Sequence, residues 1–267
     1  MSRRVLRRIG YFALGVAGAV SLFWWWQPWD YDLVPRVPKE PLAPVDPDSD
    51  RLFAKGTKVM VITAHPDDEA FYNGGTLAKL RESGVRLAFV LITDGDKAYY
   101  GPFTDQAENR RVRRAEVREL GEALSTDDIV FLGYPDGRLR DTEEVRQKVA
   151  REIERFQPDY IMAFEDQYPW RFSHSDHRRA GESAVAAAKM AGFGGWLLLF
   201  QTNAPNFRVD VTPYWDEKRE FLAIHRSQFN GDKYERIEGM VRGRAVREGS
   251  AMGVELAEGF RAVRLSR

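Results

Sequence analysis

The stretch that decides the fold is KVMVITAHPDDE, residues 58–69. Its first half, Lys58–Thr63, is a short apolar run rich in β-branched residues, which predicts a buried strand. Its second half follows at once and supplies an imidazole, a proline and three carboxylates. A dense set of polar, potentially reactive groups is therefore expected at the end of a strand.

Outward from this stretch, short β-like runs alternate with helical patterns. Strands are predicted at 58–63, 86–93, 128–131, 160–164 and 196–201, and helices at 73–83, 106–124, 142–156 and 176–190. The tail is predicted to be helical over 214–227 and 233–256, with a last strand near 260–265. The alternation is typical of βαβ crossovers and predicts an α/β fold, a Rossmann-like three-layer sandwich with a mostly parallel sheet. In such a sheet the active site lies outside the carboxyl ends of the strands, here at loops 65–69, 94–104, 133–140 and 165–176.

Charge and cysteine content exclude several classes of function. Lys plus Arg and Asp plus Glu both total 40 in 267 residues, so no basic nucleic-acid footprint is present and no nucleic-acid partner is expected. The chain has no cysteine, which excludes disulfides, thiolate metal sites and a cysteine nucleophile. Any metal must be held by nitrogen and oxygen.

The N-terminal segment predicts a membrane anchor. Residues 1–8 carry four arginines, and residues 9–26 follow as 18 residues without a charge, about 27 Å as a helix. The basic end predicts a cytoplasmic N-terminus and an extracytoplasmic catalytic domain. A cleaved signal peptide, with small residues at 17–19, is the alternative. Six of the 13 prolines fall within 28–47, so residues 27–50 are predicted to be an extended tether before a domain spanning 51–267.

Three of the four histidines fall in two of the strand-end loops. His65 lies in the first, and His174 and His177 lie in the sequence HSDH, residues 174–177. Imidazoles combined with a carboxylate form a divalent-metal ligand set that leaves a position open for water, as a catalytic zinc site requires. Taken singly, the first motif could instead cap the following helix with its carboxylates, and the second could be a solvated loop capped by Asp176.

These two motifs resemble the paired signatures of the LmbE-like, PIG-L-type zinc-dependent N-deacetylases, which act on N-acetylglucosamine-containing small molecules and glycolipids. The resemblance extends through residues 113–116, 132–137 and 225–228 and covers about 57–230. It implies that the metal, Zn²⁺ or another divalent ion, is bound by His65, Asp68 and His177. It also implies that Asp67 is the general base that activates a zinc-bound water, and that His174 is a cation that stabilises the oxyanion and protonates the leaving amine.

Further roles follow from the same resemblance and from local chemistry. Asp176 is expected to pair with His174 and to raise its pKa. Arg113 matches a position that contacts substrate in relatives, although it could be one of several solvated arginines on its helix. Asp136 is a candidate acceptor for a sugar hydroxyl, although Pro-Asp-Gly is also an ordinary turn sequence. The chain departs from the family pattern with Ser175 in place of a proline and Phe172 in place of a tyrosine found in some relatives.

The expected function is a membrane-anchored metal-dependent hydrolase that removes the N-acetyl group from an N-acetylglucosamine-type amino sugar or glycoconjugate. Two alternatives stay open: an amidase for a larger sugar amide, and a non-catalytic domain that binds a glycan or a lipid head group. His225 is expected to be structural, and Trp170 with Tyr168 is either a platform for a sugar or part of the packing.

Overall fold

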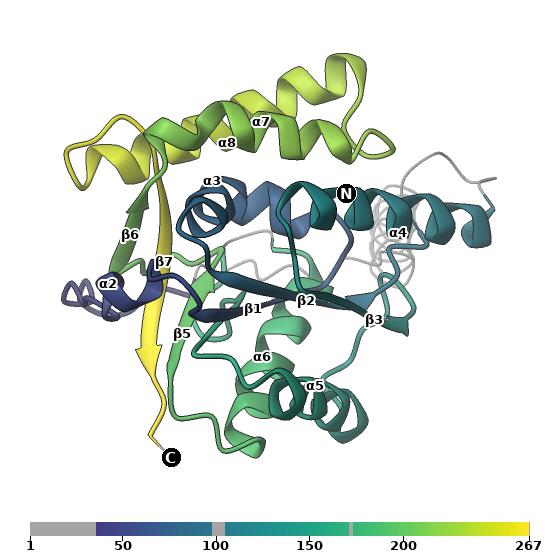
Figure 1. The fold of residues 1–267 in the computed structure, drawn as a ribbon, viewed down its shortest axis with the longest axis horizontal. Helices are drawn as coiled ribbons and strands as arrows, with labels where there is room; N and C mark the ends of the chain where they lie inside the picture. Colours follow the sequence, from purple (N-terminus) through teal and green to yellow (C-terminus); the bar gives the residue numbers. More distant parts are fainter. Residues whose placement is uncertain (1–35, 98–104, 171–172, 267) are drawn as a thin grey trace, which may run out of the picture. The chain divides into compact units, whose positions relative to one another are not determined.

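The sheet of this protein is mostly parallel, as predicted. The computed structural model describes residues 36–97, 105–170 and 173–266. Its seven strands lie in the order β3-β2-β1-β4-β5-β7-β6, and β7 runs in the opposite direction to the other six (Figure 1). The strands are β1 (Lys58–Thr63), β2 (Arg86–Thr93), β3 (Asp128–Tyr134), β4 (Tyr160–Phe164), β5 (Trp196–Phe200), β6 (Phe207–Asp210) and β7 (Ala257–Arg264).

Helices cover both faces of the sheet and complete a three-layer sandwich. On one face lie α3 (Asp68–Glu82), α4 (Gln106–Ala123), α7 (Trp215–Ile224) and α8 (Gly231–Ser250), and on the other lie α5 (Glu143–Phe156) and α6 (Ser175–Met190) (Figure 1). Two short elements, α2 (Ser49–Leu52) and η1 (Thr212–Tyr214), flank them. Because the central strands are covered on both faces, they are apolar along nearly their whole length.

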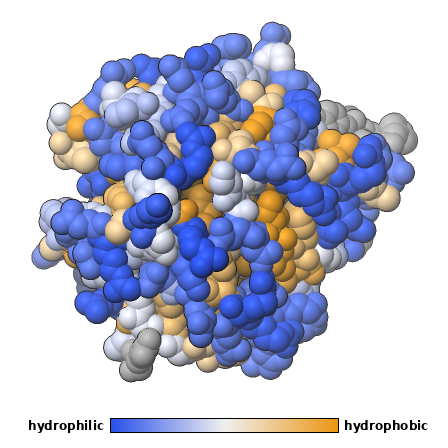
Figure 2. All heavy atoms as spheres, viewed as in Figure 1, coloured by the Kyte–Doolittle hydropathy of each residue, from blue (hydrophilic) through white to orange (hydrophobic). Residues whose placement is uncertain are grey.

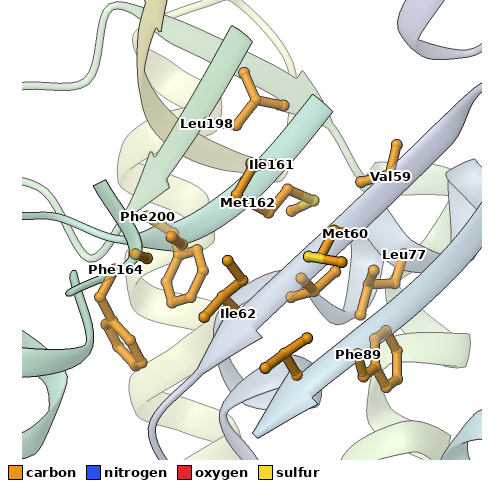
Figure 3. Packing of buried hydrophobic residues seen from close by; sticks show 14 of the residues in the cluster. Val59, Met60, Ile62, Leu77, Phe89, Ile161, Met162, Phe164, Leu198 and Phe200 are labelled. Atoms are coloured by element: carbon orange, nitrogen blue, oxygen red, sulfur yellow. The ribbon is translucent and has the colours of Figure 1, made fainter. Parts of the chain in front are cut away.

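The core lies on both sides of β1. Met60 and Ile62 of this strand pack with Leu77 of α3 and Phe89 of β2, and Phe164 and Phe200 lie close together at the ends of β4 and β5 (Figure 3). All of these side chains are fully buried. The packing therefore holds the strand ends, from which the polar loops leave, in fixed positions.

Three differences from the predicted elements bear on the architecture. The strand β6 (Phe207–Asp210) was not predicted; it is only four residues long and depends on its pairing with β7. The helix α8 ends at Ser250 and not at 256, because the chain reverses through Gly253 at a φ of 78°. The helix α3 begins already at Asp68, so the second half of the deciding stretch forms its first turn.

The predicted basic end, 1–8, and the predicted anchor, 9–26, lie outside the described residues. Among the residues the structure does describe, the helices are all too short or too polar to traverse a bilayer. The last part of the predicted tether packs on the domain: Val45 N donates to Asn206 O at 2.9 Å, and Tyr160 OH donates to Pro47 O at 3.0 Å. Residues 45–50 therefore belong structurally with the α/β domain.

Hydrophilic residues cover most of the face seen in Figure 2, and hydrophobic residues form smaller patches between them. Among the exposed large hydrophobic side chains of the described residues, Met240, Val246 and Met252 lie on α8 or directly after it.

Candidate metal and catalytic site

The two histidine motifs meet where the strand order reverses. β1 lies between β2 and β4, so the carboxyl ends of β1 and β4 are adjacent at the switch point of the sheet. His65 follows β1, and His174 and His177 follow β4 at the start of α6. The structure thus brings together the residues that the sequence placed in separate loops.

Donor atoms of three residues at this point have about the spacing of metal ligands, and Asp68 presents a different oxygen to each histidine. His65 Nδ1 lies 3.1 Å from His177 Nε2, His177 Nε2 lies 3.2 Å from Asp68 Oδ1, and His65 Nδ1 lies 3.5 Å from Asp68 Oδ2. Tetrahedral zinc with bonds of about 2.0–2.1 Å separates its ligand atoms by about 3.3–3.4 Å. The predicted set of His65, Asp68 and His177 therefore fits three positions of such a site and leaves the fourth free.

The carboxylates around the ring of His65 favour positive charge at this place. Its other nitrogen, Nε2, faces two carboxylates, Asp136 Oδ1 at 3.1 Å and Asp176 Oδ2 at 3.4 Å. Burial opposes protonation, but the charge and hydrogen bond of Asp136, with the other carboxylates, raise the pKa of His65 well above its ordinary value. In a metal site, carboxylates in this position orient the ligating histidine and make it more basic. A second group with close donor atoms, His65, Asp136 and His174, uses this Nε2 side instead.

Asp136 lies against His65. Its side chain is 11% exposed, and its backbone amide donates to Asp96 Oδ1 at 2.9 Å. Burial raises its pKa, but the charge of His65 and the hydrogen bond with it outweigh that effect and hold the pKa of Asp136 below its usual range. In this position Asp136 would orient the candidate ligand His65, and its contact with a sugar hydroxyl stays a prediction.

The other two candidate ligands are held by neighbours from β1, β4 and β5. Asp68 Oδ2 accepts from the amides of His65 at 2.7 Å and Ala64 at 3.2 Å. The ring of His177 stacks on Phe164 with centroids 4.2 Å apart, and its Nδ1 lies 3.2 Å from the amide of Gln201. Gln201 was not predicted as a site residue; its only signal in the sequence is its place at the end of the strand predicted over 196–201.

Asp67 lies beside this set in a strained conformation. Its φ of 151° and ψ of −19° belong to a region that residues with a Cβ rarely adopt. Its amide donates to Glu69 Oε2 at 3.1 Å, and its carboxylate lies 3.1 Å from Arg113 Nη2. Burial raises the pKa of Asp67 to about 6, against the opposing charge of Arg113. A carboxyl group with a pKa in this range is suited to accept a proton near neutrality.

Arg113 is buried beside the turn that carries Asp67. Its side chain is 4% exposed, and it donates to Pro66 O at 2.8 Å and to Gly95 O at 2.9 Å in addition to its ion pair with Asp67. Both branches of the guanidinium thus contact protein oxygens, so Arg113 is not one of the solvated arginines of its helix. It clamps the turn that carries Asp67, and its contact with substrate stays a prediction.

Asp176 and His174 influence each other electrostatically, and each also has other partners. Asp176 accepts from the amides of Gly137 at 2.6 Å and Leu139 at 3.1 Å, in addition to its contact with His65. His174 is the N-cap of α6, and its Nδ1 accepts from the backbone amide of Asp176 at 3.0 Å. Burial, with the charges of His65 and His177, lowers the pKa of His174 to about 3. The charge of Asp176 raises this pKa, as expected, but burial outweighs it. A pKa this low favours a neutral His174 whose Nδ1 accepts and whose Nε2 carries the proton. The proton-donating role of His174 stays a prediction.

The two departures from the family pattern have different outcomes. Ser175 is the first residue of α6, and the helix forms there with His174 as its cap, so the missing proline leaves the turn intact. Phe172 lies outside the described residues.

The late motif at 225–228 is bonded to α4, the helix that also carries Arg113. Ser227 donates from its amide and its hydroxyl to Glu116 of α4, at 2.7 and 2.5 Å. His225 is fully buried, and burial lowers its pKa to about 3. Its ring nitrogens have no hydrogen-bond partner among the described residues. The structural role expected for His225 agrees with this position.

The fold and the site together define an α/β sandwich with a candidate divalent-metal centre of two histidines and an aspartate. Residues 60–188 match the PIG-L family, described as GlcNAc-PI de-N-acetylase. The chain is 30% identical over 222 residues to the diacetylchitobiose deacetylase of Thermococcus kodakarensis, covering 77% of this chain and 83% of that protein. The chain therefore belongs to the PIG-L family, which confirms the resemblance seen in its motifs.

Two further similarities agree with this assignment. The solved structure of N,N'-diacetylchitobiose deacetylase from Pyrococcus horikoshii is 31% identical, with a TM-score of 0.76, covering 80% of this chain and 86% of that one. A probable N-acetyl-alpha-D-glucosaminyl L-malate deacetylase 2 from Bacillus anthracis is 27% identical, covering 64% of this chain and 81% of that protein. These relatives are deacetylases of N-acetylglucosamine-type sugars.

Proposed function

We propose that this protein is a metal-dependent N-deacetylase that removes the acetyl group from an N-acetylglucosamine-type amino sugar or glycoconjugate. The observation that carries the proposal is the spacing of 3.1–3.5 Å among the donor atoms of His65, Asp68 and His177. The strained carboxylate of Asp67 lies next to it in the chain, and the relatives that share the fold and the motifs are deacetylases.

Each residue of the site has its own role in the proposed reaction. A zinc ion held by His65, Asp68 and His177 would polarise the amide carbonyl and lower the pKa of a water molecule. Asp67 takes a proton from the water as its oxygen bonds to the carbonyl carbon. His174, neutral and protonated on Nε2, donates a hydrogen bond to the oxygen on which negative charge develops.

The second half of the reaction returns the proton. The bond between the carbonyl carbon and the nitrogen breaks, acetate leaves, and Asp67 gives its proton to the departing amine. A pKa of about 6 for Asp67 suits both directions of this transfer.

We also propose that residues 9–26 anchor the domain in the membrane with the N-terminus in the cytoplasm. The catalytic domain would then lie on the extracytoplasmic side. The support is the uncharged 18-residue run that follows four arginines. Protease added to intact cells is expected to degrade the domain of the full chain. A domain that stays protected until the cells are lysed would contradict this orientation.

The test of the activity is release of free amine from N-acetylglucosamine and N,N'-diacetylchitobiose by the full-length protein, with metal content measured on the same sample. Asp67→Asn is expected to keep the metal and to lose at least about 100-fold in kcat, the usual range for a general base. His177→Ala is expected to lose the metal and the activity together. Asp216→Asn, the same change at a side chain that is 93% exposed, is the matched control and should act like wild type.

Two outcomes would favour the alternatives. Metal-loaded wild type that binds these sugars without releasing amine would point to a glycan-binding domain. Release from bulkier N-acyl sugars at higher kcat/KM than from N-acetyl sugars would point to an amidase for larger amides. Full activity in Asp67→Asn would overturn the proposed mechanism.

A further inference from the structure

A cavity adjoins the metal site on the side of α8. Its lining includes Tyr72 of α3, Trp170, Phe200 of β5, and Val241 and Arg244 of α8. The volume of the cavity is about 50 Å³. Since one water needs roughly 10–15 Å³ of such space, the cavity has room for a few waters or one small polar group, and it is too small for a sugar ring.

The other charged groups that line this cavity are neutralised by partners. Lys218 pairs with Glu258, which also accepts from the amides of Gly75 at 3.1 Å and Thr76 at 2.8 Å. Glu248 pairs with Arg208 at 2.9 Å. The lining therefore contains no carboxylate that is left over to balance a further cation.

Arg244 is that further cation. Its guanidinium lies over the ring of Trp170, and within the described parts of the chain it makes neither a hydrogen bond nor an ion pair. Burial, with the charge of Arg247 on the same helix, lowers the pKa of Arg244 to about 9. Holding a charge in a half-buried place without a hydrogen-bonded partner costs free energy, which a bound anion would recover.

The cavity shares a wall with the catalytic site. Tyr72 contacts Trp170 on one side and His177 on the other, with ring centroids 5.7 Å apart in both cases. The amide of Gln201 reaches Tyr72 OH at 2.9 Å and His177 Nδ1 at 3.2 Å. Trp170 and Tyr72 thus connect Arg244 to the candidate metal ligand His177 through three successive contacts.

Trp170, which lies under Arg244, is held by two hydrogen bonds. Trp170 Nε1 donates to Thr202 O at 2.7 Å, and Trp170 N donates to Gln201 O at 3.1 Å, so the loop is fastened to the end of β5. The ring of Trp170 is already covered by the guanidinium, which leaves that face unavailable for stacking on a sugar. The role of Trp170 as a sugar platform stays a prediction for its other face.

We propose that Arg244, held over Trp170, forms a subsite for an oxyanion carried by the N-acetylated substrate, either a carboxylate or a phosphate. The planar guanidinium presents paired donors that match both groups, and the small volume of the cavity admits either. The inference rests on the proposed function, because it assigns to the substrate of that reaction an acidic substituent.

The kinetic test compares anionic with neutral substrates in the full-length metal-loaded enzyme. N-acetylmuramic acid supplies the carboxylate and N-acetylglucosamine 1-phosphate the phosphate, with N-acetylglucosamine as the neutral reference. In Arg244→Gln, the ratio of kcat/KM for the better anionic substrate to that for the neutral one is expected to fall roughly 10- to 100-fold, the range for a hydrogen bond to a charged group. Arg247→Gln removes an exposed charge from the same helix and should keep the wild-type ratio.

A binding test separates this inference from the proposed function. The same three sugars are titrated calorimetrically into metal-loaded Asp67→Asn protein, with and without Arg244→Gln. Loss of affinity for an anionic sugar alone on removal of Arg244 supports the subsite even if no sugar is hydrolysed. Arg244→Lys keeps the positive charge but lacks the paired donors of the guanidinium, so it should give a ratio of anionic to neutral sugar between those of wild type and Arg244→Gln. Melting curves check that each variant is folded.

Three results would overturn the subsite. One is a wild-type enzyme that neither binds nor turns over either anionic sugar better than the neutral one. The second is an anionic-to-neutral ratio that Arg244→Gln leaves unchanged. The third is an equal fall of that ratio in Arg247→Gln, which would assign the effect to the general field of the helix.

Discussion

Replacing Asp67 by glycine should give a more stable protein than replacing it by alanine. The reason is the backbone of Asp67, which has a φ of 151°, where a Cβ is strained and glycine is not. Both changes delete the carboxylate and its ion pair with Arg113, so that loss cancels in the comparison. The difference between the two variants therefore reports the backbone conformation at position 67 and not the lost ion pair.

The size of the difference follows from two opposing effects. A residue in so sparsely populated a region costs about 1–3 kcal/mol. Glycine loses part of this advantage, about 0.4–1 kcal/mol, because its unfolded chain is more flexible. The net expectation is about 1–2 kcal/mol in favour of glycine, or about 2–8 °C in Tm for a domain of this size.

The assay is thermal and urea unfolding of both variants after chelation of metal, so that metal binding does not contribute. Ser83, at the end of α3 with φ of −73°, is the matched control position, and there alanine should be the more stable of the two by about 0.5–1 kcal/mol. If Asp67→Ala melts as high as Asp67→Gly while the Ser83 pair behaves as expected, the turn is not strained and the reasoning fails. Neither Asp67 variant should hydrolyse an N-acetyl sugar at the wild-type rate.

Three other perturbations test the support of the site. Arg113→Lys should keep the metal but lower kcat about 100-fold, because lysine cannot clamp the turn that carries Asp67 and a misplaced reacting group slows catalysis by about that factor. A normal kcat would refute the role of Arg113 as a clamp. Gln201→Leu should weaken metal affinity about 10- to 100-fold by freeing His177, measured by competition with a chelator, and unchanged affinity would contradict its role. His225 has a folded pKa of about 3 against about 6.5 unfolded, so the unfolded state binds the extra proton and stability falls as the pH drops below about 6.5. In chelator-treated protein, the unfolding free energy of wild type should therefore fall relative to that of His225→Phe by up to about 1.4 kcal/mol per pH unit between pH 6 and 4.5. A difference between the two proteins that does not change with pH would refute the lowered pKa of His225.

The central strands and the meeting of the two histidine motifs could be predicted because their signals are local. The run at 58–63 is apolar in every position but its first and last, and β1 was predicted with the bounds that the structure has. The motifs were expected to meet because three of only four histidines follow strands, and parallel strands bring their carboxyl ends to one edge. The choice of His65, Asp68 and His177 as candidate ligands came from the family resemblance. β6 was missed because four residues carry too little pattern, and its stability comes from pairing with a strand some fifty residues away in the chain.

The roles of the supporting residues could not be predicted in the same way. Arg113 and Asp136 were expected to face substrate, yet both are buried against the catalytic turn and His65. Asp176 was expected to hold His174 protonated, yet it binds a turn from a different loop. In each case the direction of the side chain depends on neighbours that are distant in sequence.

The sequence by itself determined the fold class, the family and the residues that can hold a metal, because hydrophobic periodicity and the chemistry of donor groups are properties of short stretches. The tertiary structure decided which nitrogen of His65 faces the other candidate ligands, the strain at Asp67, the lowered pKa of His174 and, within the described residues, the position of Arg244 over Trp170. These properties depend on burial and on the distances between groups from different elements, and both exist only once the crossovers have brought the strand ends together.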